Sequence, residues 1–108
     1  MPAYDWGMAT KTERAAAAEL FRTLGSEPRL TLLEALIDGP LSVSALADKT
    51  GMAQPMVSQH LRLLRSVGVV NVEHVGREHI HRVSDEHVVH VVRDTIAHVG
   101  EVNAPDPH

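Results

Sequence analysis

Histidine and carboxylate side chains recur at helical spacing near the end of the chain. If the chain from Asp85 onward is an α-helix, which turns about 100° per residue, five of these side chains share a stripe about 80° wide. Imidazole nitrogens and carboxylate oxygens are ligands of Zn²⁺ and related divalent ions. Any one of these side chains is equally consistent with a solvated face, but their joint spacing predicts metal coordination. The stripe contains His87, His90, Asp94, His98 and Glu101.

One copy of this helix cannot close a site from both of its ends. His87 and His98 face the same way but stand about 16 Å apart along the axis at ~1.5 Å per residue, whereas metal–ligand bonds are only about 2 Å long. If two copies pack antiparallel about a two-fold axis, Asp85 and His87 of one copy meet His98 and Glu101 of the other. Each of the two equivalent sites then holds two nitrogens and two carboxylates. Zn²⁺ is the expected ion, with Ni²⁺ or Co²⁺ as alternatives.

His90 and Asp94 lie on the stripe but have no place in this ligand set. We expect them to hydrogen-bond the ligands. If they bound the ion directly, they would raise its coordination number and favour nickel or cobalt. The alternative is a cluster within one chain that combines both residues with His87. Three further histidines alternate in an upstream segment near Glu73, where metal binding is the less favoured interpretation: His74, His79 and His81.

The elements that must position these residues follow from hydrophobic periodicity and from glycine, proline and capping residues. The pattern predicts five helices, with a two-stranded hairpin before the last one. Ser84 is expected to cap the last helix, which should run from Asp85 to about Val99 and stop at Gly100. The other expected elements are a helix over Lys11–Leu24, a helix from Ser26 to Asp38, a short helix from Ser42 to near Gly51, a helix from Gln54 to Gly68, and strands over Val69–Val75 and Glu78–Val83 joined by Gly76-Arg77.

A short helix, a tight turn at glycine, a longer helix and a hairpin together outline a winged helix-turn-helix, a mainly α fold that binds double-stranded DNA. The second helix of such a motif enters the major groove, so its exposed polar residues are candidates for base contacts. Arg65 and the hairpin residue Arg77 are better placed for phosphates or the minor groove. His60 is either a phosphate contact or a packed helix residue. The base-contact candidates are Gln54, Ser58, Gln59 and Arg62.

Composition supports a single small domain that dimerises. Apolar residues make up 44% of the 108-residue chain but aromatic residues only 3%, so the core is aliphatic and small. The net charge of −4 is uneven: residues 53–83 carry four arginines against two glutamates, whereas residues 84–108 carry one arginine against five acids. We expect a flexible arm over 1–11, a DNA-binding domain over 12–101 and a flexible tail over 102–108. With no signal-peptide pattern or apolar span, the expected location is the cytoplasm, without a membrane partner.

Four segments resemble signature blocks of the ArsR/SmtB family of metal-responsive bacterial transcriptional repressors: Leu24–Leu30, Leu41–Ala47, Pro55–Leu61 and Leu64–Val70. The resemblance covers about residues 13–101. It implies a homodimeric winged helix that releases operator DNA when metal binds.

The spacing Asp-x-His-x10-His-x2-Glu is similar to the inter-subunit site of zinc-sensing members and matches at Asp85, His87, His98 and Glu101. Ser42-Val43-Ser44 stands where other members carry a cysteine-containing site, so a sulfur-dependent sensor is not expected. The predicted function is a repressor of metal homeostasis genes. The alternatives are a winged-helix regulator, possibly an activator, that senses no metal or another effector, and a protein-interaction module. No HExxH or nucleophile motif occurs, so we expect no enzyme.

Overall fold

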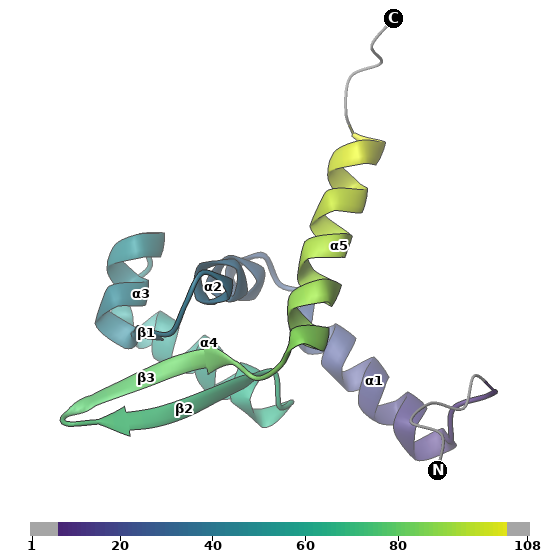
Figure 1. Cartoon of the computed structure of the whole chain (residues 1–108), viewed down its shortest axis with the longest axis horizontal. Helices are drawn as coiled ribbons and strands as arrows, with labels where there is room; N and C mark the ends of the chain where they lie inside the picture. The colour runs from purple at the N-terminus through teal and green to yellow at the C-terminus, as the bar shows by residue number, and fades with distance from the viewer. Residues whose placement is uncertain (1–6, 104–108) are drawn as a thin grey trace, which may run out of the picture.

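The computed structural model describes residues 7–103, and its order of elements is the predicted winged helix-turn-helix (Figure 1). Five helices and a small antiparallel sheet make up this part of the chain. The predicted arm and tail overlap the ends of the first and last helices. Tyr4 and Trp6 of the predicted arm and His108 of the predicted tail lie outside the described residues. The elements are α1 (Lys11–Leu24), α2 (Glu27–Ile37), β1 (Leu41–Ser42), α3 (Val43–Thr50), α4 (Gln54–Ser66), β2 (Val70–Val75), β3 (Glu78–Val83) and α5 (Glu86–Val102).

An aliphatic core holds α2, α3 and α4 against the base of the sheet. Leucine and valine supply its largest fully buried side chains, which agrees with the aliphatic core that the composition predicted. Gly51 ends α3 with a left-handed backbone (φ 77°) and donates its N–H to the carbonyl of Ala47 at 2.8 Å. This conformation favours glycine, and it turns the chain sharply toward α4. The largest core residues are Leu32, Leu33, Leu46, Leu61 and Leu64.

The sheet has three strands in the order β1-β3-β2, so the hairpin carries an additional short strand along one edge. The predicted hairpin is present, and it pairs Val70 with Val83 at its base and Val75 with Glu78 at its tip. β1 was not predicted, because two residues are too few to show the alternation that identifies a strand. It pairs Leu41 with His81 and thereby anchors the hairpin to the start of α3. The hairpin extends from the body to one side as a wing (Figure 1).

The predicted cap of the last helix was wrong. Ser84 does not cap α5, because its hydroxyl donates to the carbonyl of Gly68 at 2.7 Å. Asp85 takes the N-cap position and accepts the N–H of Val88 at 3.2 Å. Ser26 does occupy the N-cap of α2, but its side chain makes no capping hydrogen bond.

The last helix continues through Gly100 to Val102, three residues beyond the predicted end. A glycine inside a helix costs only about 1 kcal/mol, and the residues after it keep the helical pattern. Asn103 forms the C-cap and donates its N–H to the carbonyl of Val99 at 3.0 Å. Glu101 is therefore one helical turn from His98. α5 rises away from the body over most of its length (Figure 1), and none of the described helices is long and apolar enough to cross a membrane.

Candidate nucleic-acid interface and metal centre

Helix α4 separates a buried apolar side from an exposed polar side. Val57, Leu61 and Leu64 are buried in the core. Residues four apart are neighbours along one helix face, so Gln54, Ser58 and Arg62 form one exposed line, with Gln59 exposed beside it. These are the polar side chains that the sequence predicted for reading base edges, and all four are free of the core.

His60 is held by a contact with α2. Its Nδ1 accepts a hydrogen bond from Nε of Arg29 on α2 at 3.2 Å, and the same guanidinium donates to the carbonyl of Thr23 at 3.0 Å. The half-buried imidazole therefore ties α4 to α2 and, through Arg29, to the end of α1. This contact fits the packing role that the sequence left open for His60. Nothing in the sequence pointed to Arg29, because the two residues are 31 positions apart.

Arg65 is half-buried at the base of the wing, near His81. His81 is only 2% exposed, and its Nδ1 is buried without a hydrogen-bond partner. Burial lowers the pKa of His81, and the nearby positive charge of Arg65 lowers it further. Both effects favour the neutral form of the imidazole.

The wing and the start of α4 border a common groove of about 300 Å³. Arg77, at the hairpin turn, and Gln54, in the first turn of α4, both line it. Ser42 and Ser44 close its third side with hydroxyl oxygens 3.2 Å apart. The sequence did not identify these serines as part of this surface, because only β1 brings the start of α3 beside the wing. Gln54 of α4 and Arg77 of the wing thus belong to one surface, together with the two serines.

The predicted metal ligands are exposed along α5 and gather at its two ends. At the first end, Oδ1 of Asp85 lies 3.6 Å from Nδ1 of His87, whose side chain is 96% exposed. At the other end, His98 and Glu101 are neighbours at a spacing of three residues within the unbroken helix. His90 and Asp94 are exposed between the two pairs.

A single chain does not bring these pairs together. α5 is continuous from Glu86 to Val102, so His87 and His98 stay about 16 Å apart at ~1.5 Å of rise per residue. Within residues 7–103 of one chain, no three histidine, cysteine, aspartate or glutamate side chains form a group that could hold a metal ion. The donor types fit a divalent ion, but each end of α5 supplies only half of a four-ligand set.

The apolar side of α5 is only partly covered. Val92 is buried, whereas Val99 is 49% and Val102 is 67% exposed. Phe21 of α1 is also exposed, and with Val91 it lines an apolar groove of about 210 Å³ between α1 and α5. Contiguous exposed apolar surface is typical of interaction sites.

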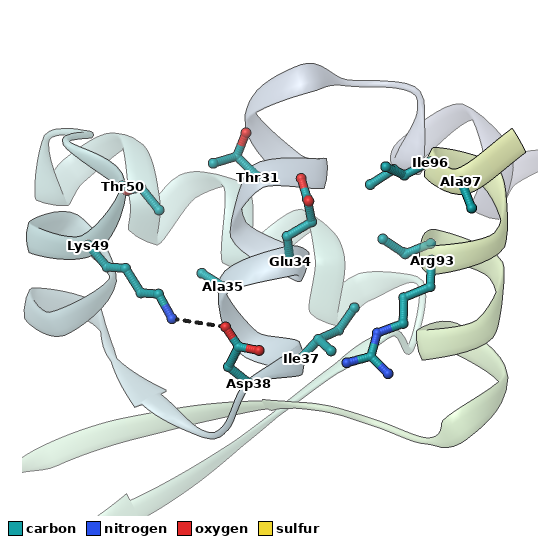
Figure 2. A pocket seen from close by; sticks show the side chains of 11 residues that line it. Thr31, Glu34, Ala35, Ile37, Asp38, Lys49, Thr50, Arg93, Ile96 and Ala97 are labelled. Atoms are coloured by element: carbon teal, nitrogen blue, oxygen red, sulfur yellow. Dashed lines mark hydrogen bonds and ion pairs between the residues drawn. The ribbon is translucent and has the colours of Figure 1, made fainter. Parts of the chain in front are cut away.

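A wider groove of about 640 Å³ lies between α2, α3 and α5, and none of the predicted site residues lines it. Figure 2 shows the Lys49 ammonium reaching the Asp38 carboxylate at 3.4 Å on the α3 side. Arg93 and Ile96 come from α5 on the opposite side. The groove mixes both charge signs, and it separates the outer part of α5 from the helix-turn-helix.

Comparisons with known proteins agree with this arrangement. The family model of bacterial regulatory proteins of the ArsR family matches residues 26–72. The HTH-type transcriptional repressor SmtB of Mycobacterium tuberculosis is 42% identical over 86 residues, which are 80% of this chain and 64% of that protein. The chain thus spans somewhat less than two thirds of SmtB.

Two further comparisons cover more of the related protein. The HTH-type transcriptional regulator NmtR of Mycobacterium tuberculosis is 37% identical over 84 residues, 78% of this chain and 70% of that protein. The crystal structure of the antimony-specific transcriptional repressor AntR superposes with a TM-score of 0.80 at 27% identity and covers 97% of this chain and 96% of that chain. The chain belongs to the ArsR family of bacterial regulatory proteins, which are transcriptional regulators and not enzymes.

Proposed function

We propose that the protein is a homodimeric transcriptional repressor that binds operator DNA through α4 and the wing and releases it when a divalent metal binds between two α5 helices. The observation that carries this proposal is the division of α5 into two half-sites. The N-cap Asp85 and His87 lie at one end of α5, and His98 and Glu101 lie at the other end. His87, His98 and Glu101 share one face of the unbroken helix.

A dimer supplies what the single chain lacks. An antiparallel pair of α5 helices would place the first half-site of one subunit beside the second half-site of the other. The same pairing would cover Val99, Val102 and the Phe21 side of α1, which are exposed in the single chain. Burial of apolar area contributes about 25 cal/mol per Å², so the exposed valines provide a driving force for this pairing.

DNA binding rests on the polar surface shared by α4 and the wing. Gln54, Ser58, Gln59 and Arg62 are exposed on the helix that enters the major groove in this fold. Glutamine pairs with adenine edges and arginine with guanine edges. Arg77 at the wing turn and Arg65 at its base supply positive charge for phosphates, which positions the protein without reading sequence.

The donor set of the proposed metal centre suits Zn²⁺, with Ni²⁺ or Co²⁺ as alternatives. Two imidazoles and two carboxylates match the nitrogen and oxygen ligands that these ions take. The bound ion would supply a positive charge shared by ligands of both subunits. His90 and Asp94 would hold the ligands by hydrogen bonds from the middle of the stripe.

Coupling between the metal centre and the DNA-binding surface follows from thermodynamic linkage. The recognition helices of a dimer must stand about one DNA turn apart, roughly 34 Å, to read two half-sites. An ion that stabilises a different relative orientation of the subunits weakens DNA binding, and DNA weakens metal binding by the same factor. α5 reaches the helix-turn-helix through its first turns, where Val88 and Val92 pack on the core.

Calorimetric titration of the apoprotein with Zn²⁺, Ni²⁺ and Co²⁺ tests the proposal, with and without a DNA duplex selected by the apoprotein from a random-sequence pool. We expect two ions per dimer and a lower metal affinity in the presence of the duplex. Failure to enrich any duplex would remove the DNA-binding function. Metal binding that leaves duplex affinity unchanged would remove the sensing function and leave a regulator that does not respond to metal.

A further inference from the structure

Two histidines of the wing face each other across the hairpin. His74 on β2 and His79 on β3 are directly opposite in the register, and their ring centroids are 4.2 Å apart with an angle of 51° between the ring planes. Both side chains are exposed and lie close to the hairpin turn. We propose that His74 and His79 form a two-histidine site for a divalent transition metal, separate from α5.

The geometry of the pair suits chelation by two imidazoles. Metal–nitrogen bonds are about 2 Å long, so two imidazoles in adjacent positions on one ion have ring centres about 4–5 Å apart. The observed separation is at the short end of this range, and rotation of exposed side chains is sufficient to adjust it. Paired strands hold the two backbones in place, so the backbone loses little conformational entropy when the ion binds.

The surroundings of the pair determine which ions it would take. The nearby carboxylate of Glu73 lies on the opposite face of the hairpin, where it accepts a hydrogen bond from Arg82 at 2.6 Å. The described residues contain no three-residue metal cluster, so the two imidazoles are the protein ligands and water fills the other positions. For a site of this type, affinity rises from Co²⁺ through Ni²⁺ to Cu²⁺ and is lower again for Zn²⁺. Cu²⁺ is therefore the ion of highest expected affinity and the appropriate probe.

The position of the pair distinguishes it from ordinary ring packing in the core. His81 lies on the same face of β3, but it is buried at the base of the wing. His74 and His79 are instead accessible to an ion from solvent, and His79 lines the groove that also contains Gln54 and Arg77. An ion bound here would add positive charge to the wing. Any effect of that charge on DNA binding rests on the proposed function, whereas the metal site itself does not.

The test uses full-length protein in which His87→Ala and His98→Ala have removed the proposed α5 ligands. Cu²⁺ is titrated calorimetrically, and nitrogen hyperfine structure in the electron paramagnetic resonance spectrum counts the imidazoles. We expect one Cu²⁺ per chain with two nitrogen ligands. Because the second ligand of a chelate binds at high effective concentration, adding either His74→Ala or His79→Ala should weaken binding by about 100-fold.

The two wing substitutions together provide the decisive comparison. If the histidines act as one chelate, each single substitution leaves one imidazole as a weak monodentate ligand, and the double substitution should remove Cu²⁺ binding from the wing altogether. Glu78→Ala, on the opposite face of the same hairpin, is the matched control and should leave Cu²⁺ affinity unchanged. Circular dichroism checks that each variant is folded. Unchanged Cu²⁺ binding in both single variants, or one nitrogen per ion in the parent, would overturn the proposal without affecting the α5 site.

Discussion

Asp85 makes two contacts through one oxygen atom, since Oδ1 lies 3.6 Å from Nδ1 of His87 and also accepts the N–H of Val88 at 3.2 Å. Asp85, the N-cap of α5, thus also lies beside His87, the first histidine of the proposed metal site. This arrangement fixes the orientation of the carboxylate before any ion binds. It also makes the structural and the metal-binding roles of Asp85 separable by substitution.

Asp85→Asn should retain the helix cap and lose metal affinity. Asparagine is as good an N-cap as aspartate, but it lacks the negative charge of the ligand. Asp85→Ala should lose both, with a cost to unfolding free energy of about 1 kcal/mol. Thermal unfolding of the apoprotein and calorimetric Zn²⁺ titration measure the two effects separately. Equal Zn²⁺ affinity in Asp85→Asn and the parent would exclude Asp85 as a ligand.

His98→Ala should abolish the effect of metal on DNA binding while leaving the apoprotein's DNA affinity close to that of the parent. His98 is exposed near the end of α5 and lies on a different element from Arg62 and the wing. A ligand shifts an equilibrium only through its differential affinity for the two states, so loss of metal binding removes the response. Fluorescence anisotropy of a labelled duplex with and without Zn²⁺ measures the effect of metal on DNA affinity.

The control for that experiment is His90→Ala, which should lower metal affinity only about 10–100-fold if His90 supports the ligands by hydrogen bonds. The opposite pattern would contradict the inter-subunit site. Normal metal binding in His98→Ala together with no binding in His90→Ala would favour the cluster of His87, His90 and Asp94 within one chain.

Arg62→Ala and Arg77→Ala should affect DNA binding in different ways. Loss of a base contact by Arg62 should cost about 1–3 kcal/mol of discrimination between sequences, and Gln59→Ala should behave similarly. Loss of a phosphate contact by Arg77 should weaken binding to all duplexes and reduce its dependence on salt. Titrations at several salt concentrations with matched and mismatched duplexes distinguish the two. An unaltered salt dependence in Arg77→Ala would show that the wing does not contact DNA.

His81 should make the folded protein less stable in acid. Burial and Arg65 lower its pKa from the ordinary value of 6.5, so the unfolded chain binds a proton more readily than the folded one. The contribution of neutral His81 to the free energy of unfolding is therefore fully present above about pH 6.5. It is lost progressively as the pH falls below that value. Denaturant unfolding of the metal-free protein between neutral and mildly acidic pH measures the slope.

His81→Leu is the matching variant, because leucine fills the site without a titrating group. It should remove this part of the acid sensitivity and be at least as stable as the parent at neutral pH, since the unpartnered Nδ1 is also removed. A variant as acid-sensitive as the parent would assign the pH dependence to other groups.

Val99→Glu should dissociate the proposed dimer. Burial of one valine contributes about 1.5 kcal/mol or more, the substitution occurs in both subunits, and tenfold in affinity corresponds to about 1.4 kcal/mol. The dissociation constant should therefore rise by about 100-fold or more. Val75→Glu is the control, because Val75 is similarly exposed but lies on the wing. Analytical ultracentrifugation over a range of concentrations measures both variants, and equal dissociation constants would place the interface elsewhere.

The sequence was sufficient to predict the helix-turn-helix and the wing, because leucine periodicity and glycine positions identify these elements locally. Three features depended on contacts between distant residues and were not predictable. β1 exists only through its pairing with His81 of β3, Ser84 is drawn away from α5 by the carbonyl of Gly68, and Arg29 bonds to His60 across 31 positions.

The α5 stripe could be read from spacing alone because it depends only on helical rotation. The end of the helix could not, since Gly100 is a plausible stop in any local pattern. The structure extends α5 to Val102, which keeps Glu101 in register with His98. The groove that joins Gln54 to Arg77 required the tertiary arrangement of α3, α4 and the wing.

Val92 is the one buried residue that α5 contributes to the described core, whereas the candidate ligands on its polar stripe are exposed. Substitutions at exposed positions generally change stability by less than about 0.5 kcal/mol. Mutations can therefore exchange ligands along this helix at little cost to folding and without altering α4. For the sensor proposed above, ion preference and operator preference can therefore evolve separately, and a lineage could change the metal that it senses while it continues to regulate the same genes.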